Sequence, residues 1–243
     1  MPSSKGTLNP NRNAIYCPGH HFRFQSPTQP AKVNTIIIAF YSKRPSRDRE
    51  SVCQLITKTT QRPKKKKQTM SFPTLHIHQP QSQTHTHTAI MLHGRGNTGP
   101  EFAEDLFSST ITKDKNLPAS LPTWRWVFST SKERWDSRFE EDLSAWFEAY
   151  SLTNIEEKEK LQVEGLKDSG ACILGILEEE IRGVGGDAGR VFLGGISQGM
   201  AMELWAFFLY AVNLKMKKSL GGVLGFCGWL PFGRVVGGGF GWW

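Results

Sequence analysis

The sequence is poor in cysteine and lacks both a long apolar run and a candidate secretion signal. Its four cysteines are Cys17, Cys53, Cys172 and Cys227. They include no CxxC pair and show no regular spacing, which argues against a zinc framework or a disulfide scaffold and fits a reducing compartment. The longest apolar run, Leu204–Val212, has half the length that a membrane-spanning helix needs, and Ile36–Phe40 is too short for a signal peptide. These absences predict a soluble protein of the cytoplasm.

Negative charge is scarce in the first 70 residues, although it is not scarce in the chain as a whole. The 243 residues hold 30 Lys and Arg against 22 Asp and Glu, a formal net charge of +8. Residues 1–70 carry 14 against 2, or +12, so residues 71–243 carry 16 against 20, or −4. Since the part with core-forming composition is acidic, we expect no specific nucleic-acid partner.

Residues 1–70 are interpreted as a basic extension without a core. They are rich in Pro, Ser, Thr, Gln and Asn and show no sustained helical or strand period, so we expect disorder. A gene-model artefact with the true start at Met70 is the alternative. Asn34–Tyr41 could form a short strand with no obvious partner. The basic run Arg62–Lys67 resembles a nuclear-import patch, which leaves the nucleus as a second location, although solvated charge runs are commoner.

From Phe72 onward the pattern is that of an α/β protein, with residues 71–232 as a partial domain and residues 233–243 as a Gly/Trp-rich tail. Strands are expected at Thr88–Leu92, Trp124–Phe128, Arg190–Leu193 and Gly221–Phe226, and helices at Leu161–Ile181 and Gln198–Tyr210. Gly183–Gly189 should end the first helix. Alternating strands and helices predict a doubly wound, mostly parallel sheet that is covered on both faces.

The segment Gly195-Ile196-Ser197-Gln198-Gly199 matches the G-x-S-x-G pattern and lies between a predicted strand and a predicted helix. A chain that reverses so sharply holds the central Ser in a strained conformation, and only small residues at Gly195 and Gly199 avoid a clash. The pattern therefore predicts Ser197 as a nucleophile. The backbone N–H of Gln198 would then stabilise an oxyanion at the helix N-terminus.

A second oxyanion donor is expected in the loop that follows Thr88–Leu92. His93, Gly94, Arg95 and Gly96 lie there, and the glycines let backbone N–H groups approach an oxyanion. The backbone N–H of Arg95 is the favoured donor. For His93 we favour a structural role in bracing the loop over a role as catalytic base.

Five segments resemble the acyl-protein thioesterase / phospholipase–carboxylesterase family of α/β hydrolases, particularly its fungal members. They are IMLHGRGNTGPEF (90–102), WRWVFSTSKERWDSRF (124–139), WFEAYSL (146–152), GRVFLGGISQGMA (189–201) and GGVLGFCGWLPF (221–232). The resemblance implies hydrolysis of acylated proteins, lysophospholipids or small esters through acyl-Ser197, with Gln198 and Arg95 as oxyanion donors. It implies no metal, no organic cofactor and at most a transient contact with a membrane surface. Trp135, Trp229 and Leu230 match acyl-pocket positions of the family; core packing is the alternative for the tryptophans.

Departures from the family pattern are small within the matched segments and large beyond them. Arg95 replaces a residue that is usually apolar, and its side chain could alter the charge preference at the mouth of the site. The family order is Ser, Asp, His, but no Asp or His follows Ser197, and the acid at Glu203 cannot reach round to orient an imidazole. We therefore expect a truncated, poorly stable and nearly inactive hydrolase, or alternatively a non-catalytic acyl-binding remnant or the unstable product of a truncated gene model.

Overall fold

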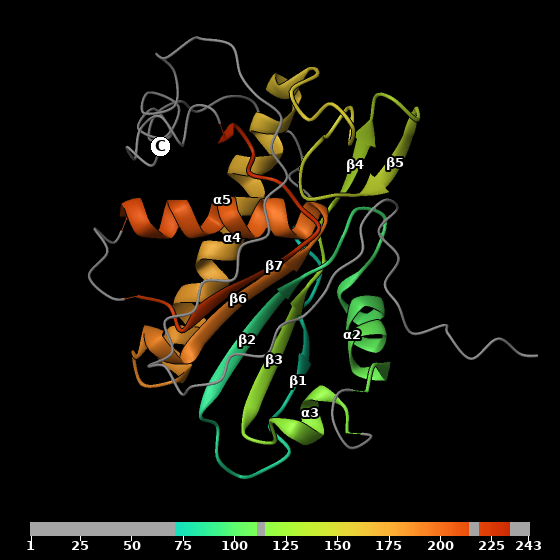
Figure 1. The fold of residues 1–243 in the computed structure, drawn as a ribbon. Coiled ribbons are helices and arrows are strands. Elements are labelled where there is room, and N and C mark those ends of the chain that lie inside the picture. Colours follow the sequence, from blue (N-terminus) through green and yellow to red (C-terminus); the bar gives the residue numbers. More distant parts are fainter. Residues whose placement is uncertain (1–70, 111–114, 214–218, 234–243) are drawn as a thin grey trace, which may run out of the picture. The chain divides into compact units, whose positions relative to one another are not determined.

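A five-stranded sheet forms the centre of the computed structural model, which describes residues 71–110, 115–213 and 219–233 (Figure 1). Its strands, in spatial order, are β1 (His76–His78), β3 (Trp124–Ser129), β2 (His87–Leu92), β6 (Val191–Ile196) and β7 (Gly222–Phe226). Strand β1 is antiparallel to β3, and the other three pairs are parallel. The predicted mostly parallel sheet is thus confirmed, with one antiparallel edge strand added.

Helices cover both faces of this sheet. They are α2 (Gly99–Ser108), α3 (Leu117–Ser120), α4 (Gln162–Gly183) and α5 (Gln198–Asn213), with short 3-10 turns η2 (Glu159–Leu161) and η3 (Ala188–Arg190). Helices α4 and α5 lie on one face, and α2 lies on the other (Figure 1). In β2, Ile90 and Leu92 belong to the core under α4 and α5, whereas Ala89 and Met91 belong to the core under α2. Burial of both faces explains the uninterrupted apolar run that predicted this strand.

A separate two-stranded ribbon follows β3. Strands β4 (Glu133–Asp136) and β5 (Glu141–Ser144) pair in antiparallel fashion, and the N–H of Ala145 donates to the carbonyl of Lys132 at 3.0 Å. The ribbon is drawn apart from the main sheet, beyond the ends of its strands (Figure 1). It is therefore placed to contact the loops that leave those ends.

The predicted elements agree with the structure within a few residues. The strand expected to begin at Arg190 begins at Val191, because Arg190 closes the 3-10 turn η3, and it continues to Ile196. Helix α4 ends where the glycine-rich segment was expected to break it, with Gly185 and Gly186 at φ of 74° and 79°. Helix α2, β1 and the β4–β5 ribbon were not predicted. The expectations for residues 1–70 and for the tail beyond residue 233 lie outside the described residues.

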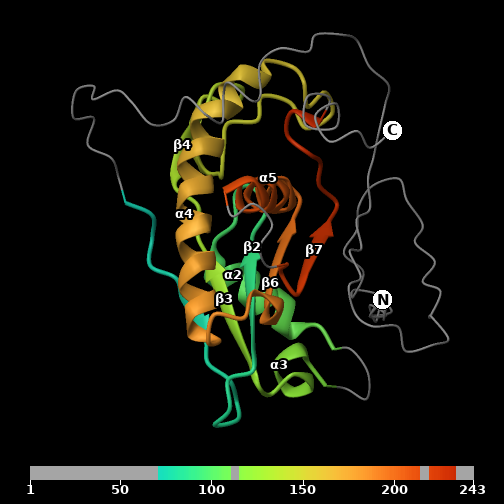
Figure 2. The same cartoon turned by 90° about the vertical axis from the view of Figure 1, so that its left-hand side faces the viewer.

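No helix within the described ranges is both long enough and apolar enough to span a bilayer. The most apolar helix is α5, which packs between α4 and the strands β6 and β7 (Figure 2). It carries buried apolar side chains on more than one side, including Met200, Met202, Leu204 and Ala206. Its composition is explained by contacts on several sides within this fold.

Candidate active site

Ser197 occupies the sharp turn between β6 and α5. Its φ of 55° lies in the left-handed region, which is unfavourable for a residue other than glycine. The N–H of Ser197 donates to the carbonyl of Phe226 at 2.8 Å, and its carbonyl accepts from the N–H of Ala201 at 3.2 Å. These bonds fix the strained turn to β7 on one side and to the first turn of α5 on the other.

The two glycines of the motif are required by close backbone contacts. A Cβ on Gly199 would lie closer than 3.0 Å to the carbonyl groups of Leu92 and His93, and a Cβ on Gly195 would collide with the backbone of Gly199. Backbone atoms cannot move aside as a flexible side chain can. The structure therefore gives a direct steric reason for the G-x-S-x-G spacing at this turn.

The loop after β2 lies beside Ser197. A Cβ on Gly94 would be 3.5 Å from the Cβ of Ser197. Gly96 adopts a φ of 80°, and its N–H donates to the carbonyl of Ser144 in β5 at 2.8 Å. The hydroxyl of Ser144 donates in turn to the carbonyl of Asn97 at 2.7 Å. Strand β5 thus holds this loop in place next to the nucleophile position.

Gln198 joins the elbow to the segment that follows β5. Its side chain is buried; its Oε1 accepts from the N–H of Trp146 at 3.0 Å, and its Nε2 donates to the carbonyl of Phe147 at 2.8 Å. Its backbone N–H belongs to the first turn of α5, where N–H groups have no acceptor within the helix. The side chain is therefore structural, and the donor role of the backbone N–H stays a prediction.

His93 is buried and uses both ring nitrogens within the fold. Its Nδ1 lies 2.7 Å from the carbonyl of Gly94, and its Nε2 accepts from the N–H of Ser131 at 3.0 Å. This pairing requires the proton on Nδ1. Burial lowers the pKa of His93, so the ring is neutral near pH 7. The Nε1–H of Trp146 also donates to the His93 carbonyl at 2.8 Å, so this residue braces the loop.

Comparison with known proteins identifies the family of the chain. A sequence model of a family described as phospholipase/carboxylesterase matches residues 73–237. The chain belongs to this family. Among solved structures, acyl-protein thioesterase 2 from Zea mays shares 25% identity over 66% of this chain and 64% of its own, with a TM-score of 0.48. The carboxylesterase from Bacillus cereus shares 13% identity over 65% of this chain and 60% of its own, with a TM-score of 0.43. The chain therefore spans less than two thirds of the length of either relative.

Arg95 forms an ion pair that the sequence did not reveal. Its Nη1 lies 3.0 Å from Oδ2 of Asp136 and 3.1 Å from the carbonyl of Ala149. The guanidinium also lies 5.2 Å from the ring centre of Phe139. The side chain is mostly buried against the ribbon and neutralised by Asp136. Its charge is thus compensated inside the fold, and the predicted effect on charge preference stays a prediction.

The three predicted acyl-pocket residues lie in different surroundings. Trp135 is 56% exposed on β4, so core packing is wrong for this residue; its side chain points away from the core because it alternates with the buried Asp136. Trp229 is partly buried, with its ring centre 6.0 Å from that of Phe147. Leu230 packs against the small cluster of Met200, Leu204 and Val223. The structure brings Trp229 and Leu230 to the core of the α5 face and leaves Trp135 in solvent.

Glu203 is a buried carboxylic acid on helix α5, which begins directly after the predicted nucleophile Ser197. Neither carboxyl oxygen makes a hydrogen bond of good geometry with the described residues. Burial raises its pKa to about 9, against a smaller opposing effect of the Leu224 backbone. Glu203 is therefore protonated near pH 7.

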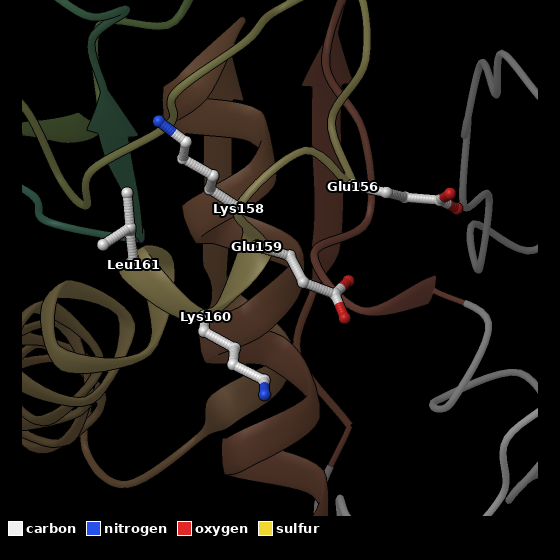
Figure 3. A pocket seen from close by; sticks show the side chains of 5 residues that line it. All are labelled: Glu156, Lys158, Glu159, Lys160 and Leu161. Atoms are coloured by element: carbon white, nitrogen blue, oxygen red, sulfur yellow. The ribbon is translucent and has the colours of Figure 1, made fainter. Parts of the chain in front are cut away.

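A surface pocket of the described residues lies elsewhere, around the turn η2 (Figure 3). It is lined by Glu156, Lys158, Glu159, Lys160 and Leu161, and in the close view the charged side chains diverge from one another. Lys158 lies over the ring of Tyr150 at 3.6 Å. None of the predicted site residues lines this pocket, and its mixed charges do not converge on one point.

Proposed function

We propose that the chain is a serine hydrolase of carboxylic esters or acyl-protein thioesters, with residues 71–232 as the hydrolase region. The observation that carries the proposal is the left-handed φ of Ser197 at the junction of β6 and α5, beside the loop of Gly94. A strained serine at a strand-to-helix turn is typical of the nucleophile elbow of this fold. Membership of the phospholipase/carboxylesterase family supports the same chemistry.

The proposed reaction runs through an acyl-enzyme. Oγ of Ser197 attacks the carbonyl carbon of the substrate, and the new oxyanion accepts hydrogen bonds from the backbone N–H groups of Gln198 and Arg95. The C–O or C–S bond then breaks, and the leaving alcohol or thiol takes up the proton that Oγ of Ser197 loses in the attack. Water hydrolyses the acyl-Ser197 ester in a second step of the same kind, which releases the carboxylic acid.

Proton transfer is the weak step of this chain. No Asp or His follows Ser197 in the 243 residues. The histidine nearest to Ser197 in sequence is His93, and both of its ring nitrogens make hydrogen bonds within the fold. A hydroxyl is a poor nucleophile until a neighbouring base accepts its proton. We therefore propose that turnover by the 243-residue chain is lower than that of a complete triad by a factor on the order of 10⁴–10⁶.

Acylated proteins, lysophospholipids and small esters are the proposed substrates, since the half-buried Trp229 and Leu230 offer apolar surface near the end of β7. The exposed Trp135 and Phe139 of the ribbon would permit a transient contact with a membrane surface. We propose the cytoplasm as the location.

A non-catalytic acyl-binding role is the second candidate function, if the hydroxyl of Ser197 proves inert. It is favoured because both ring nitrogens of His93 make hydrogen bonds within the fold, so His93 cannot act as a base.

A fluorophosphonate probe tests the nucleophile, and imidazole tests the missing base. We expect slow labelling of the intact chain that is lost in Ser197→Ala and kept in Ser137→Ala, a matched change at an exposed serine. Imidazole, as an external base, should raise p-nitrophenyl acetate hydrolysis more in the intact chain than in Ser197→Ala. Equal labelling of all three proteins would refute Ser197 as nucleophile. Fast turnover without imidazole, lost in Ser197→Ala, would refute the impairment.

A further inference from the structure

Strand β4 carries charged side chains on its inner face. Lys132, directly before the strand, is followed on the same face by Arg134 and Asp136, since side chains two positions apart point to one side of a strand. These three residues are buried or half-buried, whereas Glu133 and Trp135, which alternate with them, are exposed. Two cations and one anion therefore form a row along the inner face of β4, which we call the charge row.

The two cations of the charge row bind helix α4 through Asp168. Nζ of Lys132 lies 3.2 and 3.0 Å from Oδ1 and Oδ2 of Asp168, and Nη2 of Arg134 lies 2.8 Å from the same Oδ2. Figure 2 shows β4 beside α4. The side chains of Lys132 and Arg134 are only 12% and 18% exposed, so salt screens these pairs less than pairs in open solvent. Asp168 thus fixes the strand to the helix.

The anion of the charge row binds the loop of residues 94–97. Oδ2 of Asp136 accepts from Nη1 of Arg95 at 3.0 Å, and the two side chains are 5% and 14% exposed. Oδ1 of the same carboxylate accepts from two N–H groups in the turn between β4 and β5, at 2.9 and 3.2 Å, which fixes its direction. The loop lies beside Ser197. One face of one strand therefore connects α4 to the backbone next to Ser197 by ion pairs at both ends.

We propose that Asp136 and Asp168 are positioning residues for the oxyanion donor at Arg95, Asp136 directly and Asp168 through β4. The proposal rests on the proposed hydrolase function, in which the backbone N–H of Arg95 stabilises the oxyanion. Such a donor acts only when it is held in place before the charge develops. A misplacement of about 1 Å can lower a rate on the order of 10²-fold. The ion pair with Asp136 fixes Arg95, and Asp168 fixes the strand that carries Asp136.

Hydrogen exchange of the loop tests this coupling without a catalytic step. The N–H of Gly96 donates to the carbonyl of Ser144, so its exchange reports how often the loop opens from the ribbon. We expect Asp168→Asn to speed exchange in the peptide that contains residues 94–97 severalfold, and Asp168→Glu, which keeps the charge, to restore slow exchange. Glu164→Gln is the control, because Glu164 is an exposed acid one turn earlier on α4. Unchanged exchange in Asp168→Asn would overturn the proposal whether or not Ser197 reacts.

Fluorophosphonate labelling of Ser197 tests the consequence for the reaction, because the attack places negative charge on the phosphoryl oxygen. We expect Asp136→Asn to lower the maximal labelling rate on the order of 10²-fold and Asp168→Asn about 10-fold, with an unchanged half-saturating probe concentration. Asn at position 136 keeps the oxygen that accepts from the turn. Glu141→Gln is the matched control: Glu141 lies opposite Asp136 in β5 and is exposed, so this variant should react like the intact chain.

The outcomes separate this proposal from the hydrolase function. Equal labelling rates of Asp136→Asn and the intact chain would overturn the positioning role, as would a change in the half-saturating probe concentration alone. Far-ultraviolet circular dichroism checks that each variant folds. If Asp136→Asn unfolds, Asp168→Asn decides, since the Asp168 side chain is 36% exposed. An intact chain without Ser197-dependent labelling would refute the hydrolase function, and the exchange result would still show whether Asp168 holds the loop.

Discussion

At the scale of single residues, the glycines around Ser197 favour the folded conformation, whereas the buried Glu203 costs free energy. Any larger residue at Gly195 or Gly199 would clash with neighbouring backbone, so the two glycines allow the turn to form. Glu203 places a carboxyl group among apolar neighbours without a well-placed hydrogen-bond partner in the described residues. A buried polar group of this kind costs free energy unless it remains neutral. The acid therefore makes the stability of the fold depend on pH.

We predict that Glu203→Gln flattens this dependence. The folded-state pKa of about 9 is higher than the ordinary value of 4.5, so the contribution of Glu203 is complete below pH 4.5 and is lost as the pH rises towards 9. The loss amounts to several kcal/mol, since one pKa unit corresponds to about 1.4 kcal/mol. Denaturant unfolding across this window measures it.

Glu178→Gln serves as the control, because Glu178 is exposed on α4 and its removal should leave the pH profile unchanged. Subtracting one variant's profile from the other cancels the titration of all remaining groups. Parallel profiles for the intact chain and Glu203→Gln would show that Glu203 is solvated in the folded protein.

At the scale of elements, the β4–β5 ribbon supports the loop that follows β2. Three contacts join them: Gly96 to Ser144, Ser144 to Asn97, and Arg95 to Asp136. Oδ1 of Asp136 also accepts from backbone N–H groups of the turn between the two strands. The ribbon therefore fixes the backbone that is proposed to bind the oxyanion.

We predict that Asp136→Ala lowers the free energy of unfolding by about 3 kcal/mol or more, because it leaves the guanidinium of Arg95 buried without its partner. Arg190→Ala is the control, since Arg190 pairs with Asp187 in solvent and such pairs contribute about 0–1 kcal/mol. Thermal and denaturant unfolding give both values. Similar losses for the two variants would show that the buried pair is no stronger than the exposed one.

The elements that could be predicted are those whose signal is local. Strand β2 and helix α5 have continuous apolar composition, and the motif around Ser197 lies within five residues. Strand β1 is too short for a period, and its sequence His-Ile-His resembles a polar surface segment. The partner of Arg95 lies 41 positions away, so no pattern along the chain indicates it. Trp135 was ambiguous because an isolated aromatic residue has no period that shows which way it points.

At the scale of the whole molecule, the chain consists of a basic part, residues 1–70, and an acidic part, residues 71–243. The family match covers residues 73–237, which carry the acidic part of the sequence, and it leaves out the +12 of residues 1–70. The net charge of +8 therefore describes neither part. Any affinity of the protein for anionic polymers should depend on the first 70 residues.

We predict that the 243-residue chain is retained on a heparin column near pH 7 and elutes with rising salt, whereas residues 71–243, with a net charge of −4, pass through. Lysozyme and serum albumin, as basic and acidic standards, calibrate the column. Retention of residues 71–243 at the same salt concentration would mean that a local basic surface, rather than the extension, binds the polymer.

The position of β2 between β3 and β6 also sets the timing of folding during synthesis. Thr88 of β2 is next to Arg125 on one side and to Val191 on the other, so its second neighbour follows about 100 residues later. At ribosomal rates of about 5–20 residues per second, this strand waits for roughly 5–20 s with one edge unpaired. During that interval the nascent chain exposes Ile90 and Leu92, which later become fully buried. Translation speed and chaperone supply, more than final stability, should then decide how much of this protein a cell recovers in folded form.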